Sequence, residues 1–197
     1  MGPGSRPHTD RMPSLNLTNQ FLIAMPALDD PNFSRTVTYV CAHNEEGAMG
    51  IVINRPLNLD LGEVLSQMEL EAIDPTINEQ TVFQGGPVHR DRGFILHRPA
   101  KDWGSTIQVT DDLAVSTSRD ILAAMSRGEG PTESLVALGY AGWDAGQLEE
   151  EMAQNAWLSG PADPEIIFKA PPEQRWLRAA ALMGVDLARL SSDVGHA

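Results

Sequence analysis

The sequence holds a single cysteine, Cys41, among 197 residues. One cysteine excludes an intramolecular disulfide and any four-cysteine zinc site, and it is typical of a protein kept in a reducing compartment. The histidines also lack the H-x-x-x-H and H-E-x-x-H spacings that place two imidazoles on one helical face. We therefore expect no metal site and no cofactor.

Positive charge is scarce. Lys and Arg number 14 against 27 Asp and Glu, which gives a net charge of -13 and a pI near 4.6. Such a balance repels the phosphate backbone of nucleic acids. No basic cluster offsets it, since Arg90, Arg92 and Arg98 form the densest group. The composition argues against direct DNA binding.

Long hydrophobic runs are missing as well. The longest apolar stretch, residues 21–28, is interrupted by Pro26 and is too short to cross a membrane. It also fits a signal peptide poorly, because no basic start precedes it. We expect a cytosolic protein without a membrane segment. Residues 1–14 are rich in Gly, Pro and polar residues and predict a disordered leader, followed by one domain over residues 15–197.

Hydrophobic periodicity predicts more strands than helices. Alternating or short apolar runs predict strands at residues 21–24, 36–42, 50–53, 81–84, 94–97, 107–109, 113–115, 135–140 and 166–168. Helical spacing predicts four helices: residues 61–68 with a capping box of Asp60 and Glu63, one capped by Thr117 or Ser118 and stopped by Gly128, one after Asp144, and one from Pro172 to Gly184. The polar loop at residues 44–47 predicts a hairpin between the strands at 36–42 and 50–53. Hairpins mixed with strand–helix–strand units indicate an α/β domain, α+β-like, with a mixed sheet and helices packed against it.

The stretch from Gly139 to Glu149 reads as a strand, a glycine-rich turn and a helix start. Such a junction can hold an anion at the helix N-terminus. A structural interpretation is favoured here, because Asp144 and Gln147 form a capping-box pattern. The acidic residues 149–151 in the early turns would also repel a phosphate.

A second glycine motif, Gly85-Gly86-Pro87, follows a predicted strand directly. Two glycines before a proline require either an unusual backbone or a close approach to another chain segment. Adjacent amides there could hold a carboxylate or an oxyanion, or the motif could be a sharp turn. No Ser or Cys nucleophile lies beside it, so acyl transfer lacks its reacting atom.

Other polar residues complete the candidate set. Asn54 and Arg55 end a strand before a proline, where they could recognise a carboxylate or simply close the strand. His97 ends another strand. Cys41 and His43 stand two residues apart, too far for direct contact along a regular strand. A possible ligand site is therefore assigned to the following residues: Asn54, Arg55, Gly85, Gly86, Pro87 and His97.

Several motifs occur together in a recognisable order: residues 43–56, 83–88 with 93–97, 139–143 with 146–148, 151 and 155–158, and the ending 195–197. In this combination the chain resembles the AlgH/YqgE family of small bacterial proteins. The resemblance implies one α/β domain with a mixed, curled sheet and no helix-turn-helix. Family members are often described as transcriptional regulators, after the genetics of alginate production. The resemblance carries over no catalytic residue.

Three functions remain. The first is a non-enzymatic binding or regulatory protein that acts indirectly, through a protein or small-ligand partner. It rests on the acidic balance and on the absence of a nucleophile–base set. The second is an enzyme or ligand-binding protein with a pocket near Gly85, Gly86 and Pro87. The third is a direct transcriptional regulator, disfavoured by charge and by the missing helix-turn-helix.

Overall fold

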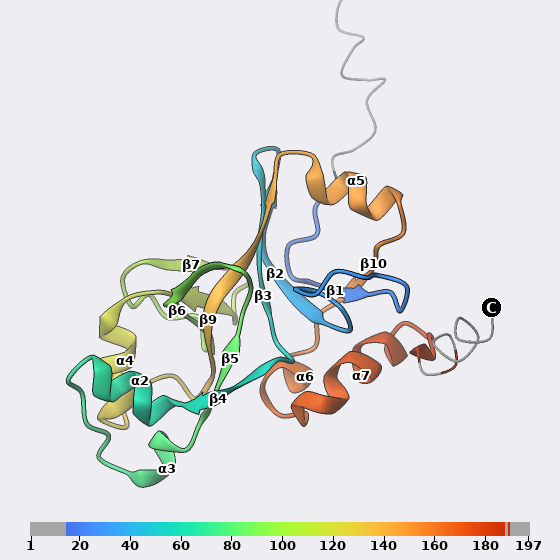
Figure 1. Ribbon diagram of the computed structural model, residues 1–197. Helices are drawn as coiled ribbons and strands as arrows, with labels where there is room; N and C mark the ends of the chain where they lie inside the picture. Colours follow the sequence, from blue (N-terminus) through green and yellow to red (C-terminus); the bar gives the residue numbers. More distant parts are fainter. Residues whose placement is uncertain (1–14, 188, 190–197) are drawn as a thin grey trace, which may run out of the picture.

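The computed structural model describes residues 15–187 and residue 189 (Figure 1). The predicted leader, residues 1–14, lies outside this range. The strands are β1 Gln20–Ala24, β2 Val37–Asn44, β3 Gly47–Val52, β4 Pro56–Asp60, β5 Thr81–Gln84, β6 Val88–Arg98, β7 Thr106–Gln108, β8 Ala114–Ser116, β9 Glu133–Asp144 and β10 Trp157–Pro161. The helices are α2 Leu61–Gln67, α3 Pro75–Asn78, α4 Arg119–Ser126, α5 Gln147–Ala153, α6 Pro164–Phe168 and α7 Arg175–Ala181, with the 3-10 turn η2 Pro172–Gln174 before the last.

Within the described residues, ten strands form one mixed, curved sheet in the order β10-β1-β2-β3-β9-β6-β8-β7. Strand β5 also pairs with β9, and β4 pairs with β5. Every pairing is antiparallel except that of β5 with β9, so the predicted mixed sheet is confirmed. The long strand β9 joins the two halves of the sheet. Residues 136–138 pair with β5 and residues 141–144 pair with β3.

The change of partner along β9 occurs at Gly139. This residue has φ +80°, and a Cβ on it would lie 2.4 Å from the carbonyl oxygen of Gly86. A Cβ on Gly86 would in turn lie 2.1 Å from the carbonyl carbon of Tyr140. The two glycine motifs therefore cross backbone against backbone, and only glycine leaves the space for this contact.

Both faces of the sheet are covered, which explains the apolar runs. In β1, Phe21 and Ile23 enter the core beneath α6 and α7, whereas Leu22 enters the opposite core beneath α5. A third core lies between β5, β6, β9 and the helices α2 and α4. Figure 1 shows α2, α3 and α4 at one end of the molecule, α5 at the top and α6 with α7 below.

The helix signals were only partly correct. Asp60 and Glu63 form the predicted capping box of α2. The predicted strand at 166–168 is wrong: these residues belong to α6, because Asp163 caps the amide of Glu165 and Pro164 fixes the first turn. A three-residue apolar run cannot by itself distinguish a buried strand from a buried helical turn.

The predicted strand–turn–helix junction at Gly139 is also wrong. Strand β9 continues to Asp144, and α5 begins at Gln147 after Gly146 at the N-cap position. The side chain of Asp144 makes no capping bond; instead its amide donates to Oε1 of Gln147 at 3.0 Å. The short helices α3 and α6 and the strands β4 and β10 were not predicted.

Candidate functional site

The glycines of the predicted ligand site serve the strand crossing. The amide of Gly85 donates to the carbonyl of Leu138 at 2.8 Å, and its carbonyl accepts from the amide of Val52 at 2.8 Å. Gly85 and Gly86 are buried. The amide and carbonyl of Gly85 therefore already have partners in the sheet. A ligand role for Gly85, Gly86 and Pro87 stays a prediction.

Asn54 and Arg55 hold the connection between β1 and β2. Asn54 accepts from the amide of Val37 at 2.9 Å and donates to the carbonyl of Arg35 at 2.9 Å. The guanidinium of Arg55 donates to three backbone carbonyls: Pro31 at 2.9 Å, Asn32 at 2.7 Å and Ser34 at 2.9 Å. Burial lowers the pKa of Arg55, and nearby Asp30 opposes the shift. Arg55 thus recognises backbone carbonyls of its own chain.

His97 lies elsewhere, fully buried on β6. Nδ1 lies 3.0 Å from the carbonyl oxygen of Pro99, which can only accept, so Nδ1 carries the proton. Nε2 then accepts from the hydroxyl of Ser116 at 2.7 Å, and Thr106 Oγ1 lies 2.7 Å from that hydroxyl oxygen. The arrangement holds a neutral imidazole. Asn54, Arg55 and Gly85 lie in one region, where the amide of Gln84 donates to the carbonyl of Arg55 at 2.8 Å. His97 lies in another, opposite Ala114 of β8 and Ser134 of β9.

The neutral state of His97 predicts a pH-dependent stability. Burial lowers the pKa of His97 below its ordinary value of 6.5, so the unfolded chain binds the proton more readily than the folded one. The contribution of His97 to the free energy of unfolding is fully present above pH 6.5. It is lost as the pH falls through 6.5 towards the lowered pKa of the folded state. Urea unfolding should give a lower free energy of unfolding at pH 5.5 than at pH 7.5, and the part due to this residue is bounded by about 1.4 kcal/mol for the one pH unit below 6.5.

The matched variant is His97→Gln, whose amide can also donate and accept but does not titrate here. Its unfolding free energy should depend less on pH between 7.5 and 5.5 than that of the wild type. An equal pH dependence in the two proteins would assign the effect to other groups.

Cys41 and His43 do not form a dyad. The thiol of Cys41 is buried, its nearest polar partner is the carbonyl of Tyr39 at 3.7 Å, and burial raises its pKa. His43 accepts the amide of Leu17 on Nδ1 at 2.9 Å and meets Glu149 through Nε2 at 3.1 Å. The contact between His43 and Glu149 joins β2 to α5.

A groove that the sequence did not reveal lies between the β2–β3 hairpin and the strands β6, β7 and β9. Two adjoining cavities of about 590 and 420 Å³ share four apolar or aromatic residues, Met49, Phe94, Ile107 and Tyr140. We call this the Tyr140 groove. The Tyr140 ring packs edge-on against Phe94, with centroids 5.3 Å apart. Its size is typical of ligand sites.

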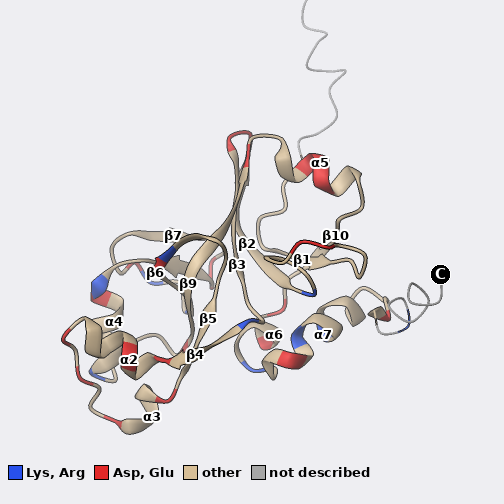
Figure 2. Cartoon of the chain, viewed as in Figure 1, with Lys and Arg blue, Asp and Glu red and all other residues tan. Residues whose placement is uncertain are grey.

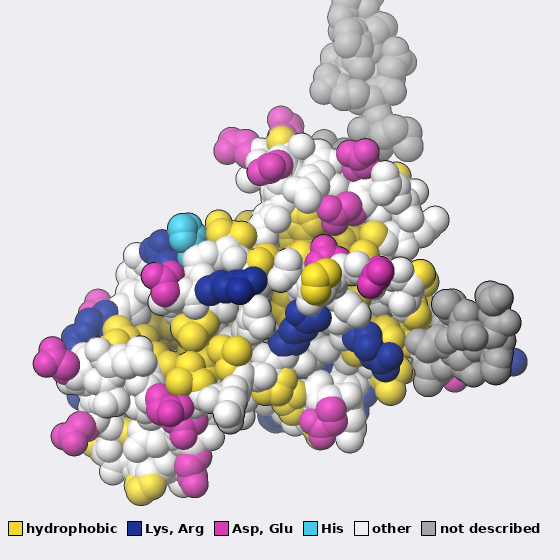
Figure 3. Space-filling model, viewed as in Figure 1, with side chains coloured by type: hydrophobic (Ala, Val, Ile, Leu, Met, Phe, Trp, Pro, Cys, Tyr) yellow, Lys and Arg dark blue, Asp and Glu magenta, His cyan; other side chains and the backbone are white. Residues whose placement is uncertain are grey.

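The two ends of the Tyr140 groove differ in charge. Glu46 and Asp144 line one end, beside the tip of the β2–β3 hairpin, while His89 and Arg92 line the other. His89 has φ +50° and its ring lies 5.9 Å from that of Tyr140. Figure 2 shows the acidic tip of the hairpin, and Figure 3 shows a histidine and basic side chains beside hydrophobic ones where β6 and β7 lie.

An open strand edge adjoins the groove. Residues 141–144 of β9 pair with β3, and within the described residues no strand pairs with their other side. Gly142 in this stretch is exposed and lines the groove. Sequence reasoning missed the groove because its residues come from strands far apart in the chain: β2, β3, β6, β7, β8 and β9. The usable signal was Arg92, a basic residue in an acidic chain, which lines the groove.

Comparison with known proteins identifies the family. A family model described as AlgH-like matches residues 21–188. The chain belongs to the AlgH-like family. Among curated relatives of this AlgH-like chain, a UPF0301 protein of Thioalkalivibrio sulfidiphilus is 61% identical over 184 residues, covering 93% of this chain and 98% of that protein. One of Nitrosococcus oceani is 55% identical, covering 91% and 96%. The suspected family resemblance is thereby confirmed.

Solved structures agree. The solution structure of the AlgH protein from Pseudomonas aeruginosa matches with a TM-score of 0.77 and 51% identity, covering 92% of this AlgH-like chain and 96% of that one. A crystal structure of a Corynebacterium diphtheriae protein matches with a TM-score of 0.66 at 18% identity, covering 86% and 88%, and shows a shared fold. No helix in the described residues is long and apolar enough to span a membrane.

Proposed function

We propose that this AlgH-like protein is a non-enzymatic binding or regulatory protein that acts through a partner protein, one segment of which lies in the Tyr140 groove. The observation that carries the proposal is the groove itself, an apolar and aromatic channel with an acidic end and a basic end. A regulatory role would then be indirect. The net charge of -13 supports this, because it opposes a direct reading of DNA.

The groove favours an extended peptide of defined chemistry. Apolar side chains would lie against Met49 and Tyr140, a basic residue near Glu46, and an acidic residue near Arg92. The open edge of β9 supports the same occupant, since an added strand gains main-chain hydrogen bonds there. Charge complementarity at the two ends would fix the direction of the peptide.

Ile107 provides the test, because it lines the groove and is 47% exposed. A photo-crosslinking residue at position 107 should capture a defined cellular partner, which is then purified. The variant Ile107→Glu should weaken binding of that purified partner by about tenfold or more, as expected for a charge placed in an apolar contact.

The matched control is Ile73→Glu, at a residue that is 73% exposed outside the groove. It should leave the partner's affinity within about twofold of the wild type. Equal weakening by both variants, or none by Ile107→Glu, would contradict the proposal. Sequence-specific retention of DNA at physiological salt would instead support the direct regulator.

A further inference from the structure

A second cavity lies on another part of the molecule, independent of the Tyr140 groove. Its volume is about 620 Å³, and it is bordered by β5, the start of β9, the end of α4 and the segment from α6 to α7. Its apolar lining includes Phe83, Leu135 and Ile167, and its polar lining includes Thr81, Ser134, Lys169 and Arg175. We call it the Arg175 cavity.

Arg175 is the unusual member of this lining. The residue is only 5% exposed, although its guanidinium carries a full charge. Nε donates to the carbonyl of Ala170 at 2.9 Å and Nη1 to the carbonyl of Ile53 at 2.5 Å, which leaves Nη2 without a hydrogen bond in the described residues. The guanidinium lies 5.0 Å from the centroid of the Phe83 ring.

No carboxylate within the described part of the chain forms an ion pair with Arg175. Burial lowers its pKa to about 10, with a smaller opposing effect of Glu173. Nη2 is not enclosed by the protein, so it faces the cavity, where water or an anion can accept its hydrogen bonds. Arg175 therefore lines the cavity as a cation whose charge is not balanced by an ion pair.

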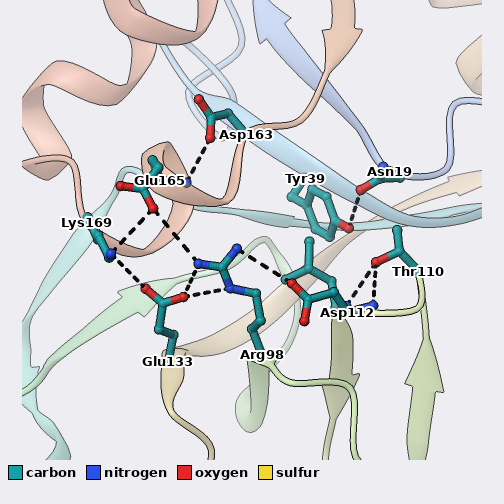
Figure 4. Close-up of polar contacts among 10 residues, drawn as sticks. Asn19, Tyr39, Arg98, Thr110, Asp112, Glu133, Asp163, Glu165 and Lys169 are labelled. Carbon is teal, nitrogen blue, oxygen red and sulfur yellow. Dashed lines mark hydrogen bonds and ion pairs between the residues drawn. The ribbon is translucent and has the colours of Figure 1, made fainter.

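Among the described residues, the carboxylate in the cavity lining is that of Glu133, and it is already paired with cations. Glu133 forms hydrogen-bonded ion pairs with Arg98 and a further ion pair with Lys169 at 3.7 Å, and Lys169 also lies 3.5 Å from Glu165. Figure 4 shows these groups pointing towards one another in a single network. The carboxylate of Glu133 is thus paired with Arg98 and Lys169, and Nη2 of Arg175 has no hydrogen bond to it.

We propose that the Arg175 cavity is a second ligand site and takes a small organic anion. One carboxylate or phosphate oxygen of the ligand accepts from Nη2 of Arg175, and the hydroxyl group of Thr81 supplies a further polar partner. The apolar body of the ligand packs against Phe168 and Pro172, which are half-buried and line the cavity. The volume of about 620 Å³ is within the range of small-molecule sites.

Nuclear magnetic resonance titration of the full chain tests the site with three probes: inorganic phosphate, benzoate and benzamide. Benzoate or phosphate should shift the Nε–H resonance of Arg175 and the amides of Thr81 and Ser134. Benzamide has the shape of benzoate without its charge, so it should shift them little. Arg55 is an internal control, because its guanidinium already donates to three backbone carbonyls.

A pair of variants leaves Arg175 in place. Thr81 is exposed at the cavity wall, and Thr81→Glu adds a negative charge there while Thr81→Gln adds the same bulk without charge. Thr81→Glu should weaken anion binding about fivefold relative to Thr81→Gln, with both variants folded. Benzoate and phosphate are separate arms, and a response to either one supports the site.

Three outcomes would overturn the assignment. The first is no shift at Arg175 with either anion. The second is an equal shift with benzamide, which would show that charge does not matter. The third is an equal shift at Arg55, which would indicate a general salt effect. None of these outcomes bears on the Tyr140 groove, because the two cavities share no residue.

Discussion

Replacing Gly139 with alanine is expected to lower the free energy of unfolding by about 3–5 kcal/mol, a large fraction of the total stability of a domain. Two costs add. The backbone at Gly139 has φ +80°, which costs an L-residue about 1–2 kcal/mol. The new Cβ would also lie 2.4 Å from the carbonyl oxygen of Gly86, so the crossing strands must separate. Gly86→Ala should be similar, because its Cβ would meet the Tyr140 carbonyl group at 2.1 Å.

Two other glycines separate these costs. A Cβ on Gly146 would meet nothing within 4 Å, although φ is +78°, so Gly146→Ala should show the backbone cost of about 1–2 kcal/mol. Gly93 in β6 has neither a close neighbour nor a positive φ, so Gly93→Ala should change stability by less than about 0.5 kcal/mol. Urea unfolding measures all four variants. If Gly139→Ala were no worse than Gly146→Ala, the crossing would not be a steric requirement.

The variant Glu151→Ala is expected to lower the free energy of unfolding by about 2–4 kcal/mol, because two indole N–H donors lose their acceptor. Oε1 of Glu151 accepts from Nε1 of Trp143 at 3.0 Å and from Nε1 of Trp157 at 2.9 Å. Oε2 accepts from Gln147 at 3.0 Å. Both tryptophans are buried, so water replaces the carboxylate poorly. Glu151 thus connects α5 to β9 and β10.

The matched control is Glu150→Ala, one residue earlier in α5 and exposed. It removes the same charge and side chain without an indole contact, and it should change stability by less than about 0.5 kcal/mol. Thermal unfolding followed by tryptophan fluorescence reports both the stability and the indole environment. Similar losses in the two variants would show that helix charge, and not the indole contact, is responsible.

The sequence predicted the elements that carry their own local signals. The capping box of α2 was found from Asp60 and Glu63, because capping depends on residues three apart. The β2–β3 hairpin followed from two strand patterns with a polar turn between them. The predicted strand at 166–168 was wrong, because its three apolar residues fit a helical turn equally well.

The candidate sites were harder to predict, because their residues meet only in three dimensions. The glycine motifs at 85–86 and 139 lie far apart in the sequence, and nothing in either motif shows that their backbones touch. The Tyr140 groove takes residues from β2, β3, β6, β7, β8 and β9, and the Arg175 cavity takes residues from α3, β5, α4, β9, α6 and α7. Spacing along the chain carries no information about such contacts.

The sequence by itself determined the class of the domain, its acidic character and its family, because periodicity, charge and ordered motifs are properties of the chain. Only the tertiary structure decided what the glycines do and where ligands could bind. Backbone crossing at Gly86 and Gly139 depends on the path of two distant strands. The unbalanced charge of Arg175 likewise depends on which carbonyls and carboxylates the fold brings near it.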